Sequence, residues 1–136
     1  MPGEIVGEIM HKVAVTCAPS SSLEEAVRIL GDSDVTSLVV VGNAGELLGV
    51  LSHMDILRHY GENLAERQVG EIMSPSVLTV QADTPIQAAI AIILNGKVHR
   101  LVVTQPGASG AIPIGVLSTT DIVRHLRWAK WAWKWV

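Results

Sequence analysis

An internal repeat constrains the fold of this chain more than any other feature of its sequence. The pentapeptide Val6–Met10 (VGEIM) returns as Val69–Met73, at an offset of 63 residues. At that offset, residues 6–41 and 69–104 are identical at 12 of 36 positions. Unrelated segments would agree at only about one position in fifteen. The 136-residue chain therefore holds two copies of one unit, and the pair is what has to fold.

A second matching block closes each copy. Residues 49–59 (GVLSHMDILRH) and 115–125 (GVLSTTDIVRH) are identical at 8 of 11 positions. After the opening block, both copies show a short apolar strand, an amphipathic helix, two strands and a second helix, and the closing block covers part of the last strand and the second helix. We therefore expect an α/β (α+β) fold of two β-α-β-β-α repeats. Because half of this chain closes little core alone, the repeats should pack through their sheets with pseudo-twofold symmetry.

Local signals predict where the first helix of each copy begins and ends. Ser21–Glu24 and Thr84–Gln87 both fit a capping box, and Pro85 stands at the favoured first helical position. Asn95 and Gly96 predict a left-handed end to the second of these helices.

Composition excludes several classes of protein. The chain has 10 basic and 13 acidic residues, which argues against a role in coating nucleic acid. Its longest nearly apolar stretch, Ile86–Leu94, has about half the roughly 20 residues of a membrane helix. The start of the sequence shows no secretory signal pattern, and Cys17 is the one cysteine, so no internal disulfide can form. We expect a cytoplasmic protein.

The two blocks and their order resemble a tandem pair of cystathionine-β-synthase (CBS) domains, known as a Bateman module. The V-G-E-I-M openings and the G-V-L-S-x-x-D-I closes carry this resemblance, which covers about residues 5–127. We expect repeats at 5–62 and 68–127, followed by a Trp/Lys-rich helical tail at 128–136. The resemblance implies a regulatory module that binds AMP, ADP, ATP or S-adenosylmethionine, requires no cofactor, and dimerises into a flat disc.

Each copy places a serine and an aspartate where a strand turns into a helix: Ser52 with Asp55, and Ser118 with Asp121. A carboxylate can accept hydrogen bonds from both hydroxyls of a ribose, and free N–H groups at a helix start can receive a phosphate. The same S-x-x-D spacing is also an N-terminal capping pattern that needs no ligand. Both roles stay open, and they are compatible if the serine caps while the aspartate reaches outward.

The resemblance implies further residues for each site, because such sites usually join one repeat's aspartate to the first strand and helix-to-strand loop of the other. The positions that match are Val15, Val35, Thr36 and Ser37 for Asp121, and Leu78, Val98, His99 and Arg100 for Asp55. Ordinary core packing is the alternative for the valines and leucine. Family members often carry a proline where Val39 and Val102 stand here, so the edge of the pocket should differ.

The copies differ in charge beside these sites. Lys97, His99 and Arg100 of the second copy are replaced by Asp34, Thr36 and Ser37 in the first. Phosphate groups need cations or N–H donors. The sequence therefore predicts a phosphate-tolerant site built with Asp55, and a weaker, neutral or empty site built with Asp121.

Metal binding and catalysis have little support in the sequence. Each copy has an aspartate and a histidine four residues apart on one helix face, with no third ligand at a suitable spacing. Cys17 lies in an expected strand and corresponds to Val80, which has no reactive group. No phosphate loop or nucleophile elbow is present. We predict that the chain is not an enzyme and holds no metal. The aspartate–histidine pairs are Asp55 with His59 and Asp121 with His125.

The tail carries all four tryptophans, and Trp128, Trp131 and Trp135 share one helix face. They can pack on their own module or across a homodimer, or anchor in the groove of a partner protein. Contact with a membrane surface is less favoured, because the segment is short and the chain acidic. The sequence predicts an adenosine-nucleotide sensor that acts in trans on a partner. The alternative is a ligand-independent dimerisation or interaction module that uses its helices and this tail.

Overall fold

The expected β-α-β-β-α order is present twice in the computed structural model, which describes residues 4–12, 15–33, 35 and 37–127. The first copy comprises β2 (Thr16–Cys17), α1 (Leu23–Asp32), β3 (Ser37–Val41), β4 (Leu47–Ser52) and α2 (His53–Leu57). The second comprises β5 (Thr79–Gln81), α4 (Ile86–Gly96), β6 (Arg100–Gln105), β7 (Ile112–Ser118) and α5 (Thr119–Leu126). Four short elements precede these copies: η1 (Val6–Glu8), β1 (His11–Lys12), η2 (Leu64–Glu66) and α3 (Val69–Ile72).

The chain forms two compact units that differ from the sequence repeats in their opening segments. The first-repeat unit contains the described residues from 15 to 77, together with 106–113. The second-repeat unit contains 4–12, 78–105 and the described residues from 114 to 127. Residues 4–12 thus open the first repeat in sequence but belong to the unit of the second.

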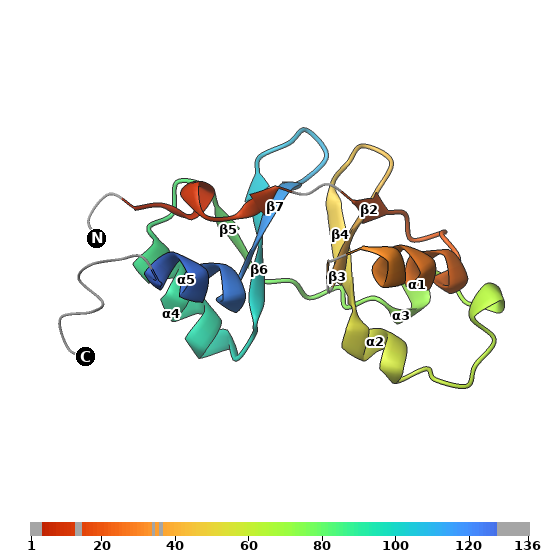
Figure 1. The fold of residues 1–136 in the computed structure, drawn as a ribbon. Helices are drawn as coiled ribbons and strands as arrows, with labels where there is room; N and C mark the ends of the chain where they lie inside the picture. The colour runs from red at the N-terminus through yellow and green to blue at the C-terminus, as the bar shows by residue number, and fades with distance from the viewer. Residues whose placement is uncertain (1–3, 13–14, 34, 36, 128–136) are drawn as a thin grey trace. The chain divides into compact units, whose positions relative to one another are not determined.

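The first-repeat unit is built on a three-stranded sheet in the order β2-β3-β4. Strand β2 runs parallel to β3, and β3 runs antiparallel to β4, with Ser37 opposite Ser52. Helices α1 and α2 lie on the same face of this sheet (Figure 1). Their apolar residues close a core around fully buried Leu23, Leu38 and Leu51.

The second-repeat unit is built on a four-stranded sheet in the order β1-β7-β6-β5. Strand β5 is parallel to β6, and β1 is an added edge strand antiparallel to β7. Helices α4 and α5 lie on one face of the sheet (Figure 1). Fully buried Leu101, Val103 and Leu117 form the centre of this core.

Residues 4–12 and 67–74, which we term the opening segments, bind their units through equivalent backbone hydrogen bonds. In the second-repeat unit, Val6 N donates to Thr84 O at 2.9 Å and Ile86 N donates to Glu4 O at 3.2 Å. The equivalent bonds of the first-repeat unit join Val69 N to Ser21 O at 2.9 Å and Leu23 N to Arg67 O at 2.8 Å. Each opening segment therefore supplies a backbone acceptor to the first N–H of a helix, which would otherwise have no intrahelical partner.

The repeated VGEIM and GVLS motifs meet in these contacts. A Cβ added to Gly49 would lie 2.7 Å from Ser74 O and 2.9 Å from the sulfur of Met73. A Cβ added to Gly115 would lie 2.5 Å from the sulfur of Met10. Glycine is required at both positions because the opening segment crosses the strand at contact distance.

The helix ends correct two of the sequence expectations. Helix α1 is capped by Ser22, whose side chain accepts from Glu25 N at 3.1 Å, one residue later than the capping box predicted. Pro85 is the N-cap of α4 and not its first helical residue, and no side chain caps this helix. At both helices the opening segment provides the acceptor for the first N–H, which belongs to Leu23 in α1 and to Ile86 in α4.

The end of α4 is the third correction. Asn95 and Gly96 are both helical, and Lys97 is the residue with a left-handed backbone, at φ 53°. A Cβ on Gly96 would lie 2.4 Å from Cδ1 of Leu78, so this glycine serves close packing and not the turn. Lys97 therefore carries a backbone conformation that costs a non-glycine residue about 1–2 kcal/mol.

Candidate ligand-binding sites

In the first-repeat unit, the candidate site begins where β4 turns into α2. Ser52 is the N-cap of α2, and its Oγ accepts a hydrogen bond from Asp55 N at 3.3 Å. Oδ2 of Asp55 accepts in return from Ser52 N at 2.8 Å and from Ser52 Oγ at 3.1 Å. This arrangement is a complete capping box, so the capping role of the S-x-x-D pattern is confirmed.

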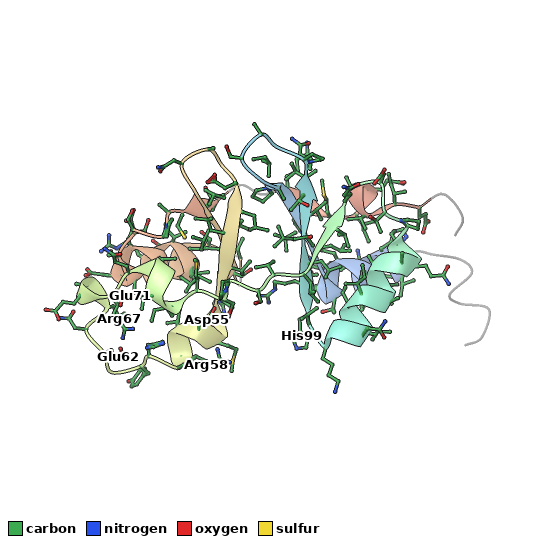
Figure 2. All side chains as sticks on the ribbon, turned by 180° about the vertical axis from the view of Figure 1, so that it is seen from behind. Asp55, Arg58, Glu62, Arg67, Glu71 and His99 are labelled. Atoms are coloured by element: carbon green, nitrogen blue, oxygen red, sulfur yellow. The ribbon has the colours of Figure 1, made fainter. Side chains whose placement is uncertain are left out.

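The second carboxylate oxygen of Asp55 has two further donors. Arg58 Nη1 lies 3.2 Å from Oδ1 and Ser74 Oγ lies 3.4 Å from it. Figure 2 shows Arg58 beside Asp55 on α2. Asp55 is only 4% exposed, whereas the side chain of Arg58 is 65% exposed. The Arg58–Asp55 ion pair therefore joins a surface cation to a buried anion.

The second-repeat unit repeats this geometry at the start of α5. Oδ2 of Asp121 accepts from Ser118 N and from Ser118 Oγ, both at 2.9 Å, and Asp121 N donates to Ser118 Oγ at 3.1 Å. Here Oδ1 contacts His11 Nδ1 at 2.6 Å. The expectation that each aspartate reaches outward is therefore wrong for these side chains: both carboxylates are buried and turn back to the serine that caps their own helix.

The cationic residues of the second copy lie at the start of β6. Lys97 and His99 are exposed, and Arg100 is half-buried at the first position of the strand. Thr119 N donates to His99 O at 2.9 Å, which places the first residue of α5 beside this strand start. Figure 2 shows His99 at that end of β6.

Arg100 is a cation without a partner of opposite charge among the described residues. Among the described residues, none forms a hydrogen bond or an ion pair with its guanidinium. Burial lowers the pKa of Arg100, although an arginine stays charged at neutral pH. A half-buried cation without an acidic partner is a favourable place for an anion. The guanidinium has already lost part of its hydration, and a bound anion would supply the opposite charge that the protein does not.

The remaining predicted site residues are distributed over both units. Val15 and Ser37 of the first-repeat unit are half-buried, and Val35 is 40% exposed. In the second-repeat unit, Leu78 is 41% exposed, and a Cβ built on Gly96 would contact both Leu78 and Val98, so these two side chains lie beside the same glycine. Thr36, together with Asp34 and the tail from Trp128 to Val136, lies outside the described residues.

His59, which lies beyond the end of α2, and His125 on α5 do not pair with the aspartates four residues before them. His59 Nδ1 lies 2.5 Å from Glu62 Oε2, and His125 Nε2 lies 2.9 Å from Glu4 Oε2. In the part of the chain that the structure describes, no group of three or more His, Cys, Asp or Glu side chains could hold a metal ion.

A charged network next to α2 was not expected from the sequence. Arg67 pairs with Glu62, and its Nε lies 3.5 Å from Glu71 Oε2 (Figure 2). Because Glu62 also contacts His59, this network joins the end of α2 to an opening segment. Only the sequence spacing of Arg67 and Glu71 gave a signal for it, since residues four apart meet on a helical turn.

Comparison with known proteins decides the family. The sequence pattern of the CBS domain matches residues 6–62 and again residues 69–127. The chain belongs to the CBS domain family. Among the helices of residues 4–127 that are described, none is long and apolar enough to cross a membrane.

Solved CBS proteins share the fold. The crystal structure of CBSX2 in complex with AMP is 31% identical, covers 90% of this chain and 96% of its own, and gives a TM-score of 0.75. The CBS domain pair of protein MJ0100, solved with 5′-methylthioadenosine and S-adenosyl-L-methionine, is 24% identical with a TM-score of 0.81. It covers 93% of this chain and 98% of its own.

Curated relatives are longer proteins. The uncharacterized protein MJ1232 of Methanocaldococcus jannaschii is 28% identical over 91% of this chain. The uncharacterized protein MK0525 of Methanopyrus kandleri is 25% identical over 88% of it. The chain spans 40% of the first and 61% of the second, so it corresponds to a part of each.

Proposed function

We propose that this CBS pair is a regulatory module that binds an adenosine compound carrying a phosphate group and acts in trans on a partner. The observation that supports it most is Arg100, a half-buried guanidinium without an acidic partner among the described side chains. His99 and Lys97 add two exposed cationic or hydrogen-bonding groups within four residues. A phosphate group would supply oxygen acceptors for these donors at the start of β6.

The relationship to CBSX2 supports an adenosine compound as the ligand. That protein was solved with AMP, and it matches this chain over nine-tenths of its length at 31% identity. The buried aspartates at the starts of α2 and α5 offer carboxylates suited to ribose hydroxyls, because each oxygen has two lone pairs. Which aspartate works with Arg100 stays the prediction made from the sequence, namely Asp55.

The decisive test exploits the repeat, in which Ser37 is the counterpart of Arg100. Arg100→Ser should weaken binding of AMP, ADP or ATP about tenfold, as expected for one charge-assisted contact, and leave binding of S-adenosylmethionine, which has no phosphate, unchanged. Thermal-shift titrations with these four compounds and with GMP measure both effects. Arg28→Ala is the control, because Arg28 is an exposed arginine paired with Glu24.

Asp55→Ala is a second test and should abolish binding at the Asp55 site. The substitution also breaks a capping box, so it should lower the melting temperature of the unliganded protein as well. Glu71→Ala removes the equivalent acid from the capping box of α3 and is the matched control for that loss. If all four compounds leave the melting curve of the wild-type protein flat at millimolar concentration, the proposal fails.

Flat curves would favour the interaction module, and one observation supports an interacting surface in either case. Three apolar side chains on and just after α2 are exposed, at 57% for Met54, 61% for Leu57 and 92% for Tyr60. Exposed apolar groups that recur along one helix are typical of protein contacts. The homodimer and the partner protein that the sequence predicts remain predictions.

A further inference from the structure

The two helix-start aspartates differ in the partners of Oδ1, and in each unit one of these partners comes from an opening segment. Oδ1 of Asp121 contacts His11 Nδ1 at 2.6 Å, whereas Oδ1 of Asp55 accepts from Ser74 Oγ at 3.4 Å. His11 and Ser74 are 63 residues apart, so they are counterparts in the repeat. The same backbone position thus carries a short contact in one unit and a long one in the other.

The backbones of these two counterparts are held alike. His11 lies on β1 opposite Val116 of β7. Ser74 pairs with Val50 of β4 through two hydrogen bonds of 3.0 and 2.9 Å. Because strand pairing fixes each backbone, the difference between the two aspartates depends on the side chains that face them.

His11 lies against the Asp121 oxygen that would have to accept hydrogen bonds from the hydroxyls of a ligand. Oδ2 of Asp121 already accepts two hydrogen bonds from Ser118, and Nδ1 of His11 lies 2.6 Å from the other oxygen, Oδ1. Asp55 has the same two bonds from Ser52, but its other oxygen faces a hydroxyl at 3.4 Å and the exposed Arg58. Because the side chain of Arg58 is 65% exposed, this cation can turn into solvent and leave Oδ1 of Asp55 to a ligand.

We propose that His11 is a built-in competitor for Asp121, which closes this carboxylate to the ribose of an adenosine ligand. The inference rests on the proposed function and deepens it: the chain binds one ligand through Asp55 at low concentration, and the Asp121 site fills only when His11 turns away. His11 has a side chain that is 68% exposed, so it can rotate into solvent without loss of core packing. His11 is a positioning residue here and does not itself hold the ligand.

Exchange of the two counterparts tests this idea. His11→Ser gives the second-repeat unit the residue of the first, and Ser74→His does the reverse. Isothermal titration calorimetry with AMP counts ligands per chain and measures their dissociation constants. His11→Ser should tighten the weaker site about tenfold, because it removes the side chain that competes for the Asp121 carboxylate, while Ser74→His should weaken the tighter site.

A double variant assigns the effect to the right carboxylate. Adding Asp121→Ala to His11→Ser should remove the weaker site again and leave the tighter one. Melting curves without ligand check that each variant is folded, and His11→Ala serves as a second replacement should His11→Ser fold poorly. A general loss of structure would lower both affinities, whereas the proposal requires one of them to rise.

Two different failures can be told apart. If the wild-type protein binds two ligands of equal affinity, or if His11→Ser changes neither dissociation constant, the competitor role is refuted and the proposed function stands. If neither wild-type protein nor any variant binds AMP, ADP, ATP or S-adenosylmethionine, the proposed function itself fails.

Discussion

At the residue scale, the S-x-x-D motif both caps a helix and holds a carboxylate that a ligand could bind. Asp55 and Asp121 are 4% and 5% exposed, yet each has all its buried oxygen atoms hydrogen-bonded. Most of those bonds come from the serine that caps the same helix. A ligand that uses either carboxylate therefore finds it already oriented, at no further cost in side-chain entropy.

Cys17 yields a prediction at the same scale. Burial, with a smaller contribution from the charge of Glu25, raises the pKa of the Cys17 thiol from 9.0 to about 11. Between these two pH values the thiol ionises in the unfolded chain but keeps its proton in the folded one. The free energy of unfolding should therefore be unaffected by this group below about pH 9 and fall as the pH rises from there towards 11.

The repeat provides the control for this measurement. Val80 is the counterpart of Cys17, and Cys17→Val should remove the part of the pH dependence that belongs to the thiol. Urea denaturation of both proteins at about pH 8 and pH 10.5 compares their free energies of unfolding. Equal losses of stability in the two proteins over this range would contradict the assignment.

At the scale of the elements, the opening segments depend on two glycines. Gly49→Ala and Gly115→Ala would place a Cβ within 3 Å of the backbone oxygen of Ser74 or His11, respectively. Because a backbone atom moves less easily than a side chain, each substitution should lower the free energy of unfolding by about 1–3 kcal/mol.

Gly31 supplies the opposite expectation within the same protein. It lies in α1, and a Cβ added there would have no atom within 4 Å. Gly31→Ala should therefore stabilise the protein by up to about 1 kcal/mol, since alanine favours the helix. Chemical denaturation of the three variants would refute the argument if all of them shifted the transition midpoint in one direction.

The elements also show how far the sequence could predict this fold. The repeat and the 3.6-residue periodicity predicted all five main elements of each copy in the right order. The caps of α1 and α4 were misplaced because their first N–H groups bond to Arg67 and Glu4, and no local pattern reports a distant acceptor. Lys97 took the left-handed position expected of Asn95 or Gly96 because Leu78 packs against that glycine.

In the candidate site too, local features could be predicted from the sequence and long-range contacts could not. Ser52 and Ser118 were predicted from local spacing, and their capping is confirmed. The contact of His11 with Asp121 joins residues 110 positions apart and has no local signal. Such pairs form because each opening segment joins the unit of the other repeat.

At the scale of the whole molecule, the crossing of the opening segments makes each repeat depend on residues outside it. Val69 is fully buried and Ile72 is 8% exposed in the core of the first-repeat unit, although both belong to the second repeat in sequence. Val6 is fully buried in the core of the second-repeat unit in the same way. A cut between the sequence repeats therefore removes core residues from both units.

Two fragments of about 60 residues test this dependence. Residues 5–62 follow the repeat boundary, whereas residues 13–77 are the continuous part of the compact unit without its segment 106–113, and they keep α3. Loss of Val69 and Ile72 removes about 1.5–3 kcal/mol of burial for each side chain, and a unit of this size has little stability in reserve. We expect cooperative thermal unfolding of 13–77 and a broad, uncooperative transition for 5–62, as recorded by circular dichroism. Equally cooperative unfolding of both fragments would show that the opening segment adds little to the unit, and Val69→Ala in the full chain should then cost less than about 1 kcal/mol instead of the several expected for a buried valine.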